Sequence, residues 1–182
     1  MHEFHQVNVN LAKMKRIGLM SDTHGFLDKK VLKYFESCDE IWHAGDIGSI
    51  DLADSIEDFK PFRAVFGNID DAKIRQRYPL DLRFECEGLD VWMTHIGGYP
   101  NRYSKRFREE MLVNSPQLFI SGHSHILKVM PDSKFDLLHI NPGACGNHGF
   151  HQMKTIVRFT VAAGEVSDLE VIELGKRGKV TE

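Results

Sequence analysis

The first seventy residues alternate between short apolar runs and segments with helical spacing. Apolar runs at 16–20, 40–44 and 62–66 predict three buried strands, because each is short and ends in a polar, glycine-containing turn. Between them, 27–37 and 50–59 place apolar residues on one face and polar residues on the other, which predicts two amphipathic helices. This order is typical of a parallel α/β unit with right-handed crossovers.

The second half contains more strands than helices. One helix is expected at 103–114, where apolar and charged positions again separate onto two faces. The sequence therefore predicts an α/β fold with two mixed sheets that face each other and helices on the outside. The strands of this half are expected at 80–86, 89–95, 118–121, 127–130, 135–140, 153–161 and 166–174.

The bulk composition fits one domain in a reducing compartment. The 182 residues suffice for one sizeable core, and we expect a single domain at 13–182 after an N-terminal extension at 1–12. The three cysteines lack a paired spacing, which favours the cytoplasm over an oxidising compartment. No apolar run approaches the roughly 20 residues of a membrane helix, so no membrane partner is expected. The net charge of −3 argues against nucleic acid as a partner, while a homo-oligomer remains open.

Five polar clusters share one position, because each directly follows a predicted strand. The carboxyl ends of strands form the edge of an α/β sheet where ligands bind, so these clusters are expected to converge. A donor set of nitrogen and oxygen without thiolate suits Mn²⁺, Fe, Zn²⁺, Co²⁺ or Ni²⁺. Seven donors suffice for two ions that share a carboxylate, an arrangement that can clamp a phosphoryl group. The candidate metal ligands are Asp22, His24, Asp46, Asn68, His95, His123 and His125.

Each cluster taken alone has a simpler explanation. Asp22 and His24 could be a helix cap and a surface histidine, and Asn68 could be an ordinary turn residue. His43 and His139 lie inside predicted strands and are expected in the core or behind the ligands rather than among them. Only the ordered set at successive strand ends favours a metal site.

The ordered set resembles the motifs of the calcineurin-like metallophosphoesterases. The resemblance covers about residues 15–174, and the short chain with Asn141-Pro142-Gly143 resembles the small prokaryotic phosphodiesterase branch, to which the retromer scaffold subunit of eukaryotes is related. It implies a four-layer αββα sandwich. The segments that carry it are Asp22-Thr23-His24, Gly45-Asp46, Gly67-Asn68-Ile69-Asp70, His95 and Gly122-His123-Ser124-His125.

The resemblance also implies an activity and a division of the ligands. It implies a phosphodiesterase with two divalent ions, Mn²⁺ first among the metals above, and a hydroxide bridging them that attacks a small phosphodiester. Asp46 would bridge the ions. The alternative is a non-catalytic or weakly catalytic scaffold of the retromer-subunit type, in which the ligand set is partly replaced. The first ion would take Asp22, His24 and His125, and the second Asn68, His95 and His123.

One position departs from the family pattern. Many relatives have a histidine directly after the asparagine, where this chain has Ile69, which cannot protonate a leaving group. We hypothesise that His148, in a glycine-rich loop after the strand expected at 135–140, supplies that proton. A solvent-exposed loop histidine is the simpler alternative. The candidate catalytic residues are therefore Asp46, Asn68 and His148.

Overall fold

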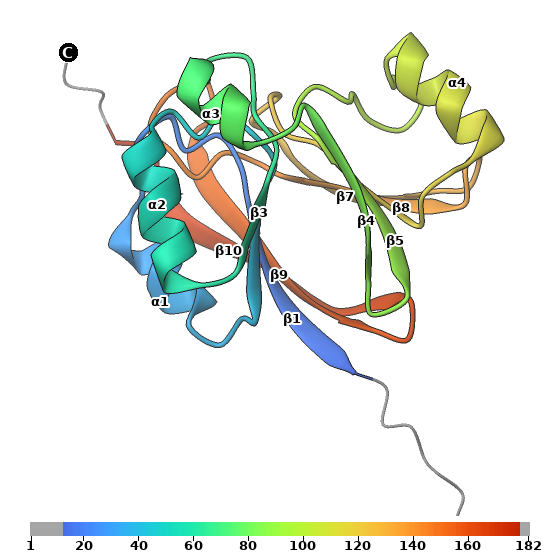
Figure 1. Ribbon diagram of the computed structural model, residues 1–182, viewed down its shortest axis with the longest axis horizontal. Helices are drawn as coiled ribbons and strands as arrows, with labels where there is room; N and C mark the ends of the chain where they lie inside the picture. Colours follow the sequence, from blue (N-terminus) through green and yellow to red (C-terminus); the bar gives the residue numbers. More distant parts are fainter. Residues whose placement is uncertain (1–12, 179–182) are drawn as a thin grey trace, which may run out of the picture.

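The computed structural model describes residues 13–178, so the extension expected at 1–12 lies outside the described residues. Two five-stranded sheets form the body of the molecule (Figure 1). The strands of the first sheet are β1 (Met14–Met20), β2 (Glu40–His43), β3 (Phe62–Ala64), β9 (Met153–Ala162) and β10 (Glu165–Lys176). Their order is β10-β9-β1-β2-β3. Strands β1, β2 and β3 run parallel, and β9 is antiparallel to both of its neighbours, β1 and β10.

The second sheet is also mixed. Its strands are β4 (Asp81–Cys86), β5 (Leu89–Thr94), β6 (Leu118–Ile120), β7 (Leu127–Asp132) and β8 (Leu137–Pro142). Their order is β4-β5-β6-β8-β7. The three central strands run parallel, and an antiparallel strand closes each edge.

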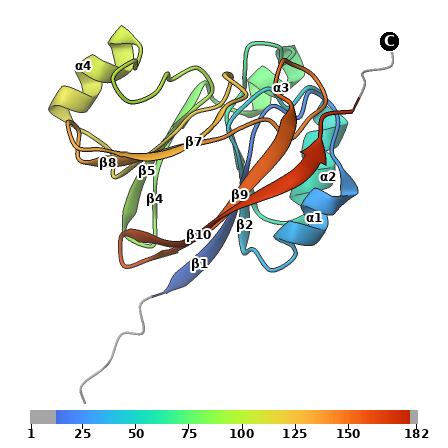
Figure 2. The same ribbon diagram turned by 180° about the vertical axis from the view of Figure 1, so that it is seen from behind.

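Helices cover the outer faces of both sheets. They are α1 (Lys29–Phe35), α2 (Ile50–Phe59), α3 (Ala72–Arg77) and α4 (Lys105–Val113). Figure 2 shows α1 and α2 on the outer side of the first sheet and α4 beyond the second. Within residues 13–178, none of these helices combines the length and the apolar character that a membrane crossing requires.

The core that joins the sheets lies between their inner faces. Trp42 and Phe159 of the first sheet belong to the same buried cluster as Val91 and Ile120 of the second. These side chains are at most 1% exposed, so the two sheets exclude water from each other. The expected four layers, helices–sheet–sheet–helix, are confirmed.

Side-chain caps determine where three of the helices begin. Asp28 accepts from the Lys30 amide at 3.0 Å, Ser49 from Leu52 at 3.1 Å, and Asp71 from Ile74 at 3.0 Å. Each cap satisfies an amide that the first turn leaves without a helical partner. Because these helices follow β1, β2 and β3, the caps also fix the length of the loops that carry candidate ligands.

The structure differs from the predicted elements in two places. The sequence did not predict α3, because Ile74 is its one buried residue and a six-residue helix shows no apolar period. Strand β7 continues through Pro131 to Asp132, beyond the strand expected at 127–130. Since β7 is an edge strand, a proline there need not interrupt the ladder of hydrogen bonds.

Removing a large side chain between the sheets should destabilise the whole fold. We expect Phe159→Ala to lower the free energy of unfolding by about 3–5 kcal/mol, because the cavity lies where both sheets meet. Leu112 on α4 is 68% exposed, and Leu112→Ala should change stability by less than about 1 kcal/mol. Urea unfolding of both variants measures the difference, and similar losses would contradict this view of the core.

Candidate metal centre

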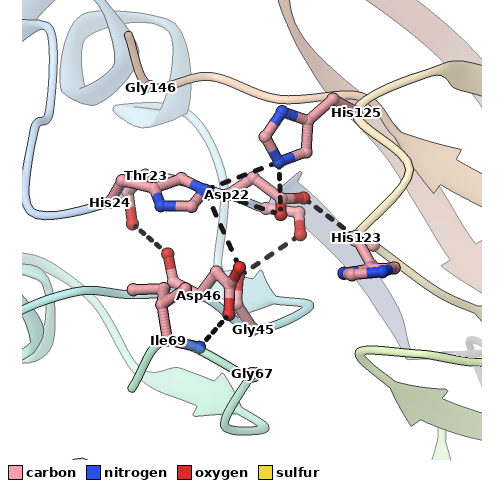
Figure 3. Close-up of polar contacts among 12 residues, drawn as sticks. Asp22, Thr23, His24, Gly45, Asp46, Gly67, Ile69, His123, His125 and Gly146 are labelled. Carbon is pink, nitrogen blue, oxygen red and sulfur yellow. Dashed lines mark hydrogen bonds and ion pairs between the residues drawn. The ribbon is translucent and has the colours of Figure 1, made fainter. Parts of the chain in front are cut away.

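All seven candidate ligands lie in loops at the carboxyl ends of parallel strands. The loops follow β1, β2 and β3 of the first sheet and β5 and β6 of the second, so both sheets contribute to one site. Figure 3 shows the side chains of Asp22, His24, Asp46 and His125 directed toward a common centre. A cavity of about 400 Å³ opens over them and is lined in part by His24, Asp46, Asn68, His123 and His125.

Asp22, His24 and His125 form the first group of donors. The Nε2 atoms of His24 and His125 lie 3.4 Å apart, and His125 Nε2 lies 3.1 Å from Asp22 Oδ1. His24 Nε2 is 4.0 Å from the same oxygen. Ligand atoms this close around one point match the spacing of donors that share an ion.

Asn68, His95 and His123 lie on the other side. His95 Nε2 is 3.1 Å from Asn68 Oδ1, and the rings of His95 and His123 are 5.2 Å apart between centroids. His95 Nδ1 lies 2.8 Å from the carbonyl oxygen of Ala44. That carbonyl can only accept, so Nδ1 carries the hydrogen and Nε2 faces the site.

Asp46 lies between the two groups. Its Oδ2 is 3.7 Å from His24 Nε2 and 3.3 Å from His95 Nε2. Its Oδ1 accepts from the Ile69 amide at 3.1 Å, which orients the carboxylate. Burial raises the pKa of Asp46, but the hydrogen bond and charge of His95 and the Ile69 amide outweigh it. The pKa of Asp46 therefore lies below its usual value, and the group is ionised at neutral pH.

Two features of the polar contacts fit bound cations. Asp22 Oδ1 is buried without a hydrogen-bond partner among the described residues, although His125 Nε2 is only 3.1 Å away. In a neutral His95 ring, Nε2 and Asn68 Oδ1 are two acceptors that face each other at 3.1 Å. A cation beside each pair removes both conflicts, and the mixed imidazole and oxygen donors suit first-row metals.

The two buried carboxylates raise the pKa of His95. Burial lowers the pKa of His95, but the hydrogen bond to Asp46 and the charges of Asp22 and Asp46 outweigh it, so the pKa is raised. The added proton gives Nε2 a hydrogen to donate. When the ring carries this proton, Nε2 can donate to Asp46 Oδ2, which lies 3.3 Å away.

The backbone at the candidate ligands is strained. A positive φ occurs at Asp22 (57°), His24 (50°), Asp46 (58°), His123 (65°) and His125 (57°), so five of the seven adopt a left-handed conformation. Residues other than glycine rarely adopt it, and each instance costs on the order of 1–3 kcal/mol. Strain concentrated at these donors indicates that their positions serve function rather than stability.

Glycines allow the loops to approach one another. A Cβ at Gly67 would lie 2.0 Å from Asp46 Oδ1, and one at Gly45 would lie 2.6 Å from His95 Nδ1. A Cβ at Gly149 would lie 2.0 Å from His125 Nδ1. At all three positions, the atoms that a Cβ would crowd belong to the candidate ligands themselves.

His43 holds the first two loops together from behind. It is fully buried, accepts from the Gly45 amide through Nδ1 at 3.1 Å, and lies 2.9 Å from Thr23 Oγ1 through Nε2. Burial lowers the pKa of His43 to about 4, so the ring is neutral. Thr23 in turn donates to the Ile47 carbonyl at 2.9 Å. His43 is thus a positioning residue, as its place in the strand suggested.

Two further positioning residues were not identified from the sequence. Asp70 is buried and accepts from the Gly48 and Gly67 amides, each at 2.7 Å, which ties together the loops after β2 and β3. Asn141 donates to the Gly122 carbonyl at 2.8 Å and so holds the loop of His123 and His125. Both belong to the motifs quoted above, but only tertiary contacts reveal what they do.

Comparison with known proteins gives the family. The family model described as the calcineurin-like phosphoesterase superfamily domain matches residues 14–164. The chain belongs to this superfamily. A probable metallophosphoesterase of Methanothermobacter thermautotrophicus is 29% identical over 171 residues, which cover 87% of this chain and 92% of the relative.

Solved structures show the same calcineurin-like fold. An archaeal phosphodiesterase superposes with a TM-score of 0.69 at 22% identity, covering 87% of this chain and 99% of the other. Vps29 of Chaetomium thermophilum superposes with a TM-score of 0.67 at 12% identity, covering 90% and 100%. At such low identity the similarity establishes the fold alone. Family membership makes this chain a phosphoesterase relative for which divalent metals are expected.

The two positions discussed for leaving-group protonation lie beside this calcineurin-like site. Ile69 is 45% exposed, and its backbone amide rather than its side chain contacts Asp46. His148 is exposed, with its ring centroid 5.5 Å from that of His24. His151 is held by Gly146, since its Nε2 lies 3.1 Å from that carbonyl oxygen. The loop at 146–151 therefore packs against the first donor group.

A small substitution at Gly67 should test whether Asp46 binds metal. Gly67→Ala should displace the Asp46 carboxylate, because the new Cβ would overlap it. The backbone conformation at Gly67 does not itself disfavour alanine, since its φ is not positive. We expect a loss of metal affinity of at least about tenfold, measured by calorimetric titration with Mn²⁺. Gly178→Ala is the matched control, since its Cβ meets only Asn147 at 3.6 Å. Equal metal affinity in both variants would contradict this role for Gly67.

Proposed function

We propose that the chain is a phosphodiesterase with a dinuclear metal centre. Asp46 bridges the two ions, and Mn²⁺ is the first choice of metal, with Fe, Zn²⁺, Ni²⁺ or Co²⁺ as alternatives. The substrate is a small phosphodiester, and a cytoplasmic location stays a prediction from the sequence. In this proposal, the first ion is bound by Asp22, His24 and His125. The second ion is bound by Asn68, His95 and His123.

The single observation that carries the proposal is the position of Asp46 Oδ2. This oxygen lies within 4 Å of an imidazole nitrogen from each donor group. One carboxylate in contact with both sets is what a bridged pair of ions requires. The ions, when bound, supply a hydroxide nucleophile and polarise the phosphoryl oxygens.

The protein's own residues position these parts. The Ala44 carbonyl fixes the His95 ring, and the Ile69 amide fixes the Asp46 carboxylate. Burial is the main cause that lowers the pKa of His24, so its ring stays neutral and keeps a lone pair for a metal. A site arranged in advance in this way needs little reorganisation as charge develops on the phosphoryl group.

The shape of the site supports a diester rather than a monoester. The cavity over the donors shares His123, Ser124 and Ile126 with a second cavity of about 260 Å³. It shares Asn68 with a third cavity, of about 340 Å³, and Ile96 lines both the second and the third cavity. A diester carries an organic group on each side of phosphorus, and each of these two cavities offers room for one.

The alternative function is a scaffold of the retromer-subunit type. The similarity to Vps29 in fold favours it, and the exposed apolar side chains of Ile69, Ile96 and Ile126 near the site give it a surface. A scaffold, however, does not need seven converging donors. The retained donor set therefore favours the enzyme.

Asp46→Asn should distinguish the two functions. Replacing the bridging carboxylate by a neutral amide should lower the rate of bis(p-nitrophenyl) phosphate hydrolysis by more than ~100-fold. Mutating residues that only hydrogen-bond to metal ligands costs up to about that much. Bound metal should fall from two ions to one or none, as measured by elemental analysis. Asp51→Asn, at an exposed position on α2, is the control. A wild-type protein without bound metal or Mn²⁺-dependent activity would favour the scaffold.

We also propose that His148 donates the proton to the leaving group. Its ring lies beside His24, at the rim of the site, while Ile69 offers no proton. His148→Ala should slow hydrolysis of phenyl diesters at least about tenfold, but p-nitrophenyl diesters little, because the poorer leaving group needs the proton more. Metal content should be unchanged. Equal losses for both substrates, measured as kcat/KM, would exclude this role.

A further inference from the structure

A lateral cavity beside the metal site has features of a specificity pocket. It lies on the outer side of the second sheet, and its walls come from the loop after β5, the loop after β6, and strands β7 and β8. Its volume of about 260 Å³ is slightly below the ~300–1,000 Å³ of pockets that hold whole ligands. This size suits one ring. The residues that matter here are Ile96, Tyr99, Ile126, Lys128, His139 and Asn141.

The lateral cavity adjoins the cavity over the candidate ligands. His123, Ser124 and Ile126 line both the lateral cavity and the cavity over the donors. His123 belongs to the proposed second metal group. A group joined by one ester bond to a phosphate at the metals can therefore extend past His123 into the lateral cavity.

The walls of the lateral cavity combine an aromatic face with a free cation. The Lys128 ammonium lies 3.6 Å from the centroid of the Tyr99 ring, which holds the side chain in place. No carboxylate lies within ion-pair distance of Lys128 in the part of the chain that the structure describes. Its N–H groups are thus available to an acceptor on a ligand, while Ile96 and Ile126 give apolar contact.

An imidazole without hydrogen-bond partners lies at the base of this cavity. His139 is fully buried, and neither ring nitrogen has a hydrogen-bond partner among the described residues. Burial, with a smaller effect from Lys128, lowers the pKa of His139 to about 4, so the ring is neutral. A buried polar group without a partner is uncommon in a native protein. The sequence predicted His139 in the core or behind the ligands. Packing in the core does not explain why two ring nitrogens are buried there without hydrogen-bond partners.

We propose that the lateral cavity binds a planar ring carried by one ester arm of the substrate. The ring contacts Tyr99 and Ile126, and Lys128 donates a hydrogen bond to an acceptor atom on it. This proposal rests on the proposed metal centre, which anchors the phosphate. The substrate class is accordingly a phosphodiester of a ring-bearing alcohol, such as a nucleoside or a phenol, rather than a dialkyl diester.

The test compares two ligands that differ only in the ring. Methylphosphonate and phenylphosphonate share the group that binds metal, and neither is hydrolysed. In calorimetric titration of the Mn²⁺-loaded full chain, phenylphosphonate should bind roughly tenfold tighter, because only it has a ring to bury. Tyr99→Ala should remove most of this advantage and leave methylphosphonate unchanged. Lys128→Met should weaken 4-nitrophenylphosphonate, which carries an acceptor, more than phenylphosphonate.

The control variant is Leu80→Ala, a 49% exposed side chain at the third cavity. It should keep the preference for the ring. Equal affinity of the two phosphonates in the wild type, or a preference lost as much in Leu80→Ala as in Tyr99→Ala, would overturn the proposal. Because binding is measured without turnover, an inactive protein that prefers the ring would refute the proposed catalysis and support the pocket. An active protein without the preference would refute the pocket.

Discussion

The structure around the site depends on two buried carboxylates that no lysine or arginine within residues 13–178 neutralises. Asp22 and Asp46 are at most 2% exposed, and their ligand atoms lie within 4.8 Å of each other. Among the described residues, only histidines lie within ion-pair distance of either one. At an effective dielectric of about 20, two such charges repel by about 3–4 kcal/mol. A pair of divalent cations converts this repulsion into attraction, which makes the two carboxylates the strongest physical reason for metals here.

The loops that hold these carboxylates have little freedom of their own. Left-handed backbone at Asp22 and Asp46, and the absence of a Cβ at Gly67, bring the loops after β1, β2 and β3 into contact. Such a conformation persists only where the surroundings over-determine it. Asp70 and the neutral His43 supply that constraint by hydrogen bonds between loops, and the core between the sheets fixes the strands from which the loops start.

The sequence predicted the convergence of the donors because that convergence follows from local rules. An apolar run followed by a polar turn marks the carboxyl end of a strand, and parallel strands bring such ends to one edge. The short helix α3 was not predicted, because a single buried residue gives no repeating apolar pattern along the sequence. The contact of Asp70 with Gly48, that of Asn141 with Gly122, and that of Tyr99 with Lys128 each join segments far apart in the chain. No local pattern reports contacts of that kind.

The repulsion between the two carboxylates also bears on the choice between enzyme and scaffold. A protein that used this fold only as a scaffold would have no need of two buried carboxylates that repel each other, since their repulsion serves no interface. This chain has both carboxylates, five strained donors, and two side cavities that each share a candidate ligand with the cavity over the site. The side cavities add what a metal cage alone does not require, namely room for the two organic groups of a diester. The repulsion between the carboxylates and the shape of the cavities thus both support the proposed phosphodiesterase over the scaffold.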